Sequence, residues 1–259
     1  MRMMKKVLGT VTVLALSVSL LAGCGSTAVS PVSSTASTVA ESTTSSVVSE
    51  TTSAAADENA AAAAQLLNDL TGSYQELWPV ILADEYQQTW LDNCTALVGE
   101  ENAEAAFEKL SSMVTGDVYG EDAVEAYANG GGAYFCGFTN SLATLTFDGE
   151  TSTISGTDKD GNVLFSHTYH YIGMEPVHGL YEFESDDADS GEFTYFFLAP
   201  DTSAETYHIE FRYGSDAEAL SQYDAGEYAY WVASGISTDC DQTMIDNCIE
   251  LCCTENLAG

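Results

Sequence analysis

Hydrophobic and polar residues alternate with period two through the second half of the chain, from about Ala133 onward. Each alternating run is short, and turn signals such as Asp148-Gly149 and Asp160-Gly161 separate the runs. Strands are predicted over residues 134–138, 143–147, 153–157, 163–172, 179–185, 193–199 and 207–213. Short strands joined by tight turns favour an antiparallel meander or barrel.

Apolar residues recur at helical spacing on both sides of this alternating region. Phe107, Leu110 and Val114 form one such stripe, and Gly116 ends it. Helices are predicted over residues 85–98, 103–114, 121–128, 216–231 and 241–257, with mixed helix and turn over 66–82. The predicted fold class is therefore α+β, an antiparallel β-barrel flanked by N- and C-terminal helices.

The first 23 residues form a targeting segment. A cationic start is followed by an uncharged, mostly apolar run over residues 7–22, which is short for a membrane span. The sequence Leu21-Ala-Gly-Cys24 resembles the lipobox of bacterial lipoproteins. That resemblance implies cleavage before Cys24, a lipid on its sulfur and an extracytoplasmic location on the cell membrane. An ordinary signal peptide with an incidental cysteine is the alternative.

The chain after the targeting segment divides into a tether and one domain. Residues 24–60 are rich in Ser, Thr and Ala and hold no aromatic residue, so they bury too little apolar surface to offset their ordering entropy. We expect this segment to be a disordered tether. Residues 61–259 suit a single domain with a sizeable core.

Acidic residues dominate the charge. Without the targeting segment, 40 acidic residues face three basic ones, Lys109, Lys159 and Arg212, a formal balance near −37. Such a chain excludes nucleic acid as a partner, since phosphate binding needs a positive surface. Anionic lipid headgroups would repel the domain as well, which leaves the lipid on Cys24 as the only membrane contact. The field concentrates cations, but without selectivity.

The run 206–216 carries the most informative pattern. Read as a strand, it places His208, Glu210 and Arg212 on one face. A histidine and a carboxylate two residues apart on one face project in parallel and can share a metal ion. An ion pair between Glu210 and Arg212 is the metal-free alternative.

This run resembles the zinc-binding strand of the bacterial ZinT family of extracytoplasmic, lipocalin-like (calycin) proteins. The family strand carries His-x-His, then Gly-x-Asp and a helix. Here His208, Gly214 and Asp216 match, while Glu210 replaces the second histidine. The opening Leu-x-Gly-x-Tyr-x-x-Leu-x-Pro at residues 70–79 is also similar. The resemblance implies a lipocalin-like barrel that binds zinc, or cadmium or another divalent ion.

The third zinc ligand of the family lies on the preceding strand, just before an Ala-Pro turn. Phe196 occupies that position here. His167 and His170 are the candidates to replace it, and being three apart on a strand they point to opposite faces. We favour His167, because its face also carries Phe165 and Tyr169, as expected for the inside of a cup. His208, Glu210 and His167 are therefore expected to open into one cavity. His178 is expected to be a solvated loop residue.

Six cysteines accompany Cys24. Outside the cytoplasm an even number indicates disulfides, with fifteen connectivities open. The alternative to disulfides is metal binding: Cys248 and Cys252 are four residues apart on a predicted helix and could share a soft metal ion.

No enzyme signature is found: the nucleophile elbow, the His-Glu-x-x-His helix, the phosphate-binding loop and the dinucleotide fingerprint are all absent. We therefore expect a non-enzymatic, zinc-binding lipoprotein that aids metal capture or delivery to an uptake system, such as a metal-uptake ABC transporter component. The alternative is a metal-free lipocalin-like module that binds a small ligand or a partner protein.

Overall fold

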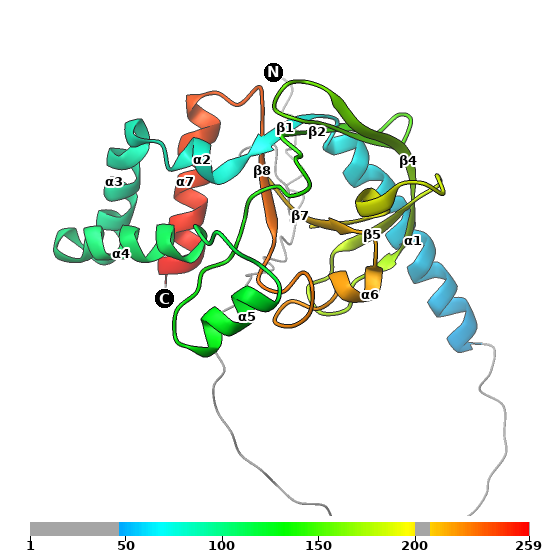
Figure 1. Ribbon diagram of the computed structural model, residues 1–259, viewed down its shortest axis with the longest axis horizontal. Helices are drawn as coiled ribbons and strands as arrows, with labels where there is room; N and C mark the ends of the chain where they lie inside the picture. Colours follow the sequence, from blue (N-terminus) through cyan, green and yellow to red (C-terminus); the bar gives the residue numbers. More distant parts are fainter. Residues whose placement is uncertain (1–46, 200–207, 259) are drawn as a thin grey trace, which may run out of the picture. The chain divides into compact units, whose positions relative to one another are not determined.

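Eight antiparallel strands close into a barrel in which each strand pairs with its neighbour along the chain (Figure 1). The computed structural model describes residues 47–199 and 208–258, all of which fall in one unit of the chain, Ala36–Gly259. The strands are β1 (Gly72–Glu76), β2 (Thr144–Asp148), β3 (Thr153–Thr157), β4 (Val163–Met174), β5 (Tyr181–Ser185), β6 (Tyr195–Leu198), β7 (His208–Gly214) and β8 (Ala233–Ser237). Pairing of β1 with β8 closes the barrel, with Tyr74 opposite Ser237. The predicted antiparallel barrel is confirmed.

Helices precede, interrupt and follow the strands. They are α1 (Val47–Asp69), α2 (Leu77–Ile81), α3 (Gln87–Val98), α4 (Glu100–Met113), α5 (Glu121–Ala128), α6 (Ala217–Leu220) and α7 (Gln242–Leu257), with short 3-10 turns at Asp84–Tyr86 and Gly191–Phe193. Figure 1 shows α3, α4 and α7 gathered on the side of β8, and α1 on the side of β4. The flanking helices of the prediction are confirmed.

Aromatic rings fill the inside of the barrel. Phe183 on β5, Phe196 on β6 and Tyr213 on β7 lie opposite one another in register and are fully buried. Ring contacts join Phe196 to both Phe165 and Tyr213. Eight strands enclose a space just wide enough for side chains to fill, and here large side chains fill it.

A second apolar cluster lies outside the barrel wall. We call the helices that form it, α2, α3, α4 and α7, the helical layer. Ile236 of β8 faces this layer, where it packs in one cluster with Trp90, Cys94 and Ile249. Trp90 donates its ring N–H to the carbonyl of Ile81 at 2.7 Å, so the indole is satisfied although it is buried. The outer face of β8 is therefore buried from solvent, as its inner face is.

Two predicted elements differ from the structure, and two observed strands were missed. Residues 134–138 form no strand among the described residues; Phe135 makes only isolated bridges to Thr115 and Trp231. The predicted helix 216–231 is limited to α6, because Asp216 caps a single turn and Tyr228, Ala229 and Trp231 are then buried in irregular backbone. Strands β1 and β8 were not predicted.

Helix α1 overlaps the end of the expected tether. It begins at Val47 and so includes residues 47–60, which were expected to be disordered. Eight of the eleven residues 54–64 are alanine, which has the highest helix propensity. The same helix continues to Leu66 and Leu67, which belong to the barrel core together with Leu70, the residue just after the helix. The expected targeting segment, residues 1–23, and Cys24 lie outside the described residues. None of the helices in the described ranges is both long and apolar enough to cross a bilayer.

Candidate metal site

Strand β7 places His208 and Glu210 on the outer wall of the barrel. Ile209, Phe211 and Tyr213 belong to the barrel core, so the residues between them face away from it. His208 lies opposite Ile236, which faces the helical layer, and Glu210 lies opposite Ser234. Both side chains are half-buried. We call them the outer-face pair. The predicted division of this strand into two faces is confirmed.

Two thiols lie within electrostatic range of the Glu210 carboxylate. Burial, and next the charge of Glu210, raise the pKa of Cys136 to about 12. The hydrogen bond with Cys248 is the largest cause of a raised pKa at Cys252, followed by burial and by the charges of Cys248 and Glu210. Both thiols are therefore protonated at neutral pH, and a metal ion could recruit them only by displacing a proton.

Arg212, the third outward residue of β7, is fully buried. Its guanidinium donates hydrogen bonds to the carbonyls of Leu220, Gln222 and Tyr228. It also lies over the ring of Tyr223, 4.2 Å from the centroid. No ion pair between Arg212 and Glu210 is found within the described ranges. Arg212 therefore fixes the chain after α6.

His178 packs against the same tyrosine. Its ring centroid lies 3.8 Å from that of Tyr223, and its Nδ1 is 3.6 Å from a carboxylate oxygen of the fully buried Glu175. Burial lowers the pKa of His178, while Glu175 acts in the opposite direction. The expectation of a solvated loop histidine is wrong, because the segment after Glu175 folds back onto the residues that Arg212 holds.

His167 lies on the inner face of β4, as its predicted association with Phe165 and Tyr169 required. Its ring stacks on Phe165, and its Nδ1 is 2.8 Å from a carboxylate oxygen of Asp187. His170 points to the outer face, where its Nδ1 is 2.8 Å from Asp186. The acidic run between β5 and β6 thus provides a partner for each histidine.

The structure does not assemble the three predicted ligands into one site. His167 faces the inside of the barrel on β4, whereas the outer-face pair faces the helical layer from β7, three strands away around the wall. Phe196 also faces inward, so the family position that it occupies does not meet the outer-face pair. In the described part of the chain, no three His, Cys, Asp or Glu side chains stand close enough together to hold a metal ion. The prediction that these residues open into one cavity is wrong, because His208 and His167 lie on opposite faces of the same sheet.

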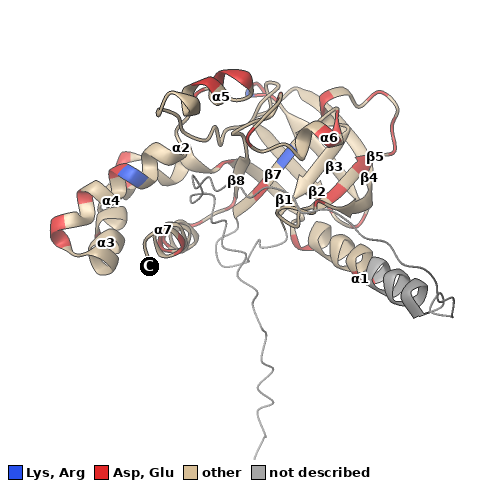
Figure 2. Cartoon of the chain, turned by 90° about the horizontal axis from the view of Figure 1, so that it is seen from below, with Lys and Arg blue, Asp and Glu red and all other residues tan. Residues whose placement is uncertain are grey.

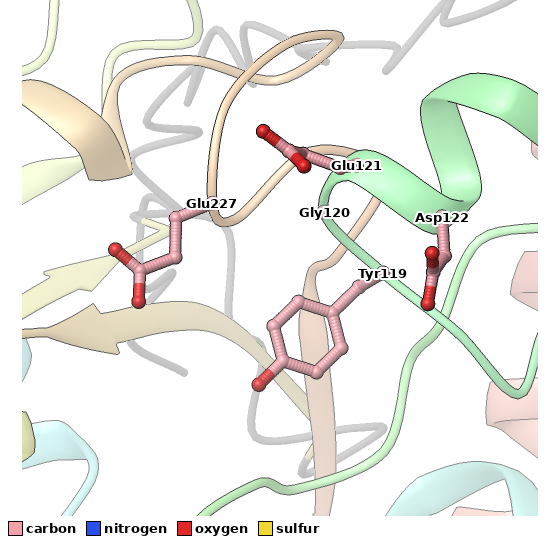
Figure 3. Close-up of a pocket in the computed structure, with 5 residues that line it drawn as sticks. All are labelled: Tyr119, Gly120, Glu121, Asp122 and Glu227. Atoms are coloured by element: carbon pink, nitrogen blue, oxygen red, sulfur yellow. The ribbon is translucent and has the colours of Figure 1, made fainter.

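A surface pocket of about 420 Å³ lies at the start of α5 (Figure 3). Tyr119, Gly120, Glu121, Asp122 and Glu227 line it. Figure 3 shows the Tyr119 ring below Gly120, with the three carboxylates arranged around the opening. Acidic residues occur on many elements of the molecule, so their presence here is not distinctive (Figure 2). None of the predicted ligands lines this pocket.

Comparison with known proteins gives structural similarities only. No protein-family model matches the chain, and no curated protein matches its sequence. Among solved structures, the Zn(II)-bound ZinT-like domain of Streptococcus pneumoniae AdcA matches with a TM-score of 0.45 and 16% identity, covering 71% of this chain and 89% of that domain. Zn(II)-bound AdcA from the same organism matches with a TM-score of 0.42 and 14% identity. This chain covers 34% of that longer protein, so it spans about a third of its length. The barrel follows from the strand pairing and does not depend on these similarities.

Proposed function

We propose that this chain is an extracytoplasmic protein that binds divalent cations, zinc before others, through His208 and Glu210. One observation carries the proposal: the imidazole of His208 and the carboxylate of Glu210, two residues apart, lie on the same face of β7 and are half-buried under the helical layer. Imidazole, carboxylate and thiol are the ligands that zinc accepts. The resemblance of residues 206–216 to the ZinT strand points to the same metal.

The described residues fit a weak site better than a tight one. They offer two donors on β7, and the two thiols whose pKa the charge of Glu210 raises, Cys136 and Cys252, are protonated at neutral pH. Water must fill the remaining positions of a tetrahedral shell unless a thiol gives up its proton. We therefore expect binding in the micromolar range that tightens as the pH rises, because recruiting a thiol releases a proton.

Calorimetric titration of zinc into the reduced, chelator-stripped protein tests the proposal. Binding should disappear in His208→Ala and weaken in Glu210→Gln. His170→Ala is the matched control, since it removes an imidazole from the outer face of another strand and should leave the isotherm unchanged. Unchanged binding in His208→Ala refutes the proposal. Loss in His167→Ala instead would place the metal at the inner face of β4.

The proposed location on the membrane rests on the lipobox and is independent of the metal. Cys24 would carry the lipid, and the anchored domain would capture metal outside the cytoplasm and deliver it to an uptake system, such as an ABC transporter component. Metabolic labelling with a radioactive fatty acid should mark the wild-type chain and not Cys24→Ser. Equal labelling of both chains would remove the anchor from the proposal.

A metal-free binding module is the second candidate. The aromatic filling of the barrel gives a small ligand no room inside it, but the pocket beside Tyr119 has the volume of a small-molecule site. Its three carboxylates favour a cationic ligand, for which the Tyr119 ring offers a face. Absence of zinc binding, together with a Tyr119→Ala-sensitive response to an organic cation such as spermidine, would favour this candidate.

A further inference from the structure

The sulfur atoms of Cys94 and Cys253 lie 3.9 Å apart. Cys94 is on α3 and Cys253 is on α7, and both residues are fully buried where these two helices pack together in the helical layer. The described cysteines are all thiols in the structure. A disulfide has its sulfurs about 2.0 Å apart, so these two atoms need to approach by roughly 1.9 Å, a movement that side-chain rotation supplies with little shift of the helices.

We propose that Cys94 and Cys253 form a disulfide that ties α3 to α7. The two S–H bonds break and one S–S bond forms. The two electrons and two protons pass to an external disulfide, such as oxidised glutathione or the active-site disulfide of a thiol oxidoreductase, which becomes two thiols. The reaction proceeds by thiolate attack through a mixed disulfide.

The geometry of α7 argues against the competing pair on the same helix. Cys248 and Cys252 are four residues apart on α7 and share a hydrogen bond. Side chains at this spacing have Cβ atoms about 5–6 Å apart, whereas a disulfide requires about 3.5–4.5 Å. Closing that bridge would distort the helix, while the bridge from Cys94 joins two separate helices that are already in contact.

Burial decides when the bond can form. Burial, followed by the neighbouring Cys94, raises the pKa of Cys253 to about 12, and burial also raises the pKa of Cys94. Almost no thiolate is present in the folded protein, and an external disulfide cannot reach either sulfur. The bond must therefore form while α3 and α7 are still opening and closing during folding, and once formed it is protected from reductants.

Refolding in a glutathione redox buffer tests the inference. The unfolded, reduced chain is refolded with oxidised and reduced glutathione, free thiols are alkylated, and the digest is analysed by mass spectrometry without reduction. A peptide pair that links Cys94 to Cys253 is expected. Folded, reduced protein exposed to the same buffer should give far less of this product over the same time. Absence of the linked pair after refolding, or dominance of a bridge to another cysteine, overturns the inference.

Thermal unfolding provides a second measurement. Reduction under denaturing conditions followed by refolding without oxidant should lower the melting temperature of the wild type by about 5–15 °C. The Cys94→Ala/Cys253→Ala variant should show no difference between the two refolding conditions. Cys240→Ser is the matched control, because this half-buried cysteine lies outside both helices, and it should retain the full difference. Retention of the difference in the double variant would contradict the assigned pairing. Neither measurement involves zinc, so its outcome is separate from that of the metal proposal.

Discussion

Replacing Arg212 by methionine should destabilise the domain severely. Methionine keeps much of the volume of the buried stem but removes the guanidinium. The carbonyls of Leu220, Gln222 and Tyr228 then lose their donors, and those of Leu220 and Tyr228 lie in a place that water does not reach. The segment that these carbonyls hold covers the outer wall of β7, so the loss falls on packing as well as on hydrogen bonding.

The magnitude follows from two opposing contributions. Each buried acceptor left without a donor costs about 1–3 kcal/mol, and the contact with Tyr223 adds about 2 kcal/mol when it is shielded from water. Removing a buried charge also relieves its desolvation penalty, which is several kcal/mol. The net loss in the free energy of unfolding should therefore be about 3–5 kcal/mol.

Urea unfolding followed by circular dichroism measures this loss. With a slope of about 2 kcal/mol per molar urea, the midpoint should fall by roughly 1.5–2.5 M. Lys109→Met is the matched control, because it removes the same charge from an exposed position on α4 and should change stability by no more than about 0.5 kcal/mol. If both variants shift the midpoint equally, Arg212 acts only through the net charge of the protein and the reasoning is refuted.

Three further predictions concern a titrating group, the packing of the barrel and the face of β6. Burial lowers the pKa of His178 below its ordinary 6.5, so the unfolded chain binds more protons than the folded protein, and the free energy of unfolding should fall as the pH drops from about 6.5. In a pH series of melting curves, His178→Gln should make the melting temperature depend less on pH below 6.5. An unchanged dependence would contradict this prediction. Gly156→Ala places a methyl group against the side chains of Leu142 and Phe165 and should cost about 1–3 kcal/mol in urea unfolding. Gly131→Ala, whose methyl group would have its nearest atom at 3.9 Å, should cost nothing, and equal effects of the two variants would argue against a filled barrel. Phe196→His restores the histidine of the ZinT pattern but points it inward, so zinc calorimetry should show no gain in affinity, and a tenfold gain would mean that β6 presents its other face.

The sequence predicts an element well where one of its faces is buried and the other is exposed to solvent. Residues 153–157 alternate in burial and form β3 with the predicted bounds, and residues 121–128 form α5 likewise. Strand β8 could not be recognised in this way, because Ala233, Ser234, Gly235 and Ile236 are all buried, with the barrel core on one side and the helical layer on the other. Its small residues show neither alternation nor high strand propensity.

The candidate site shows a similar division. The alternation of side chains along a strand correctly places His208 and Glu210 on one face and Ile209 and Phe211 on the other, because this alternation follows from local strand geometry. Which face enters the barrel depends on the register of β7 with β6 and β8 and on the helices that cover the wall. Those contacts are distant in the sequence, so the pattern did not reveal that His167 and the outer-face pair lie on opposite faces of the sheet.

The pairing of β1 with β8 closes the barrel late in synthesis and folding. The two strands lie near opposite ends of the folded segment, so the ring of backbone hydrogen bonds is completed only after nearly all of that segment has been synthesised. Pairing between such distant partners slows folding, and until it occurs two unpaired strand edges are exposed to other chains. A chain that ends before Ala233 would keep both edges permanently. Self-association, rather than a smaller stable barrel, is the expected fate of such a fragment.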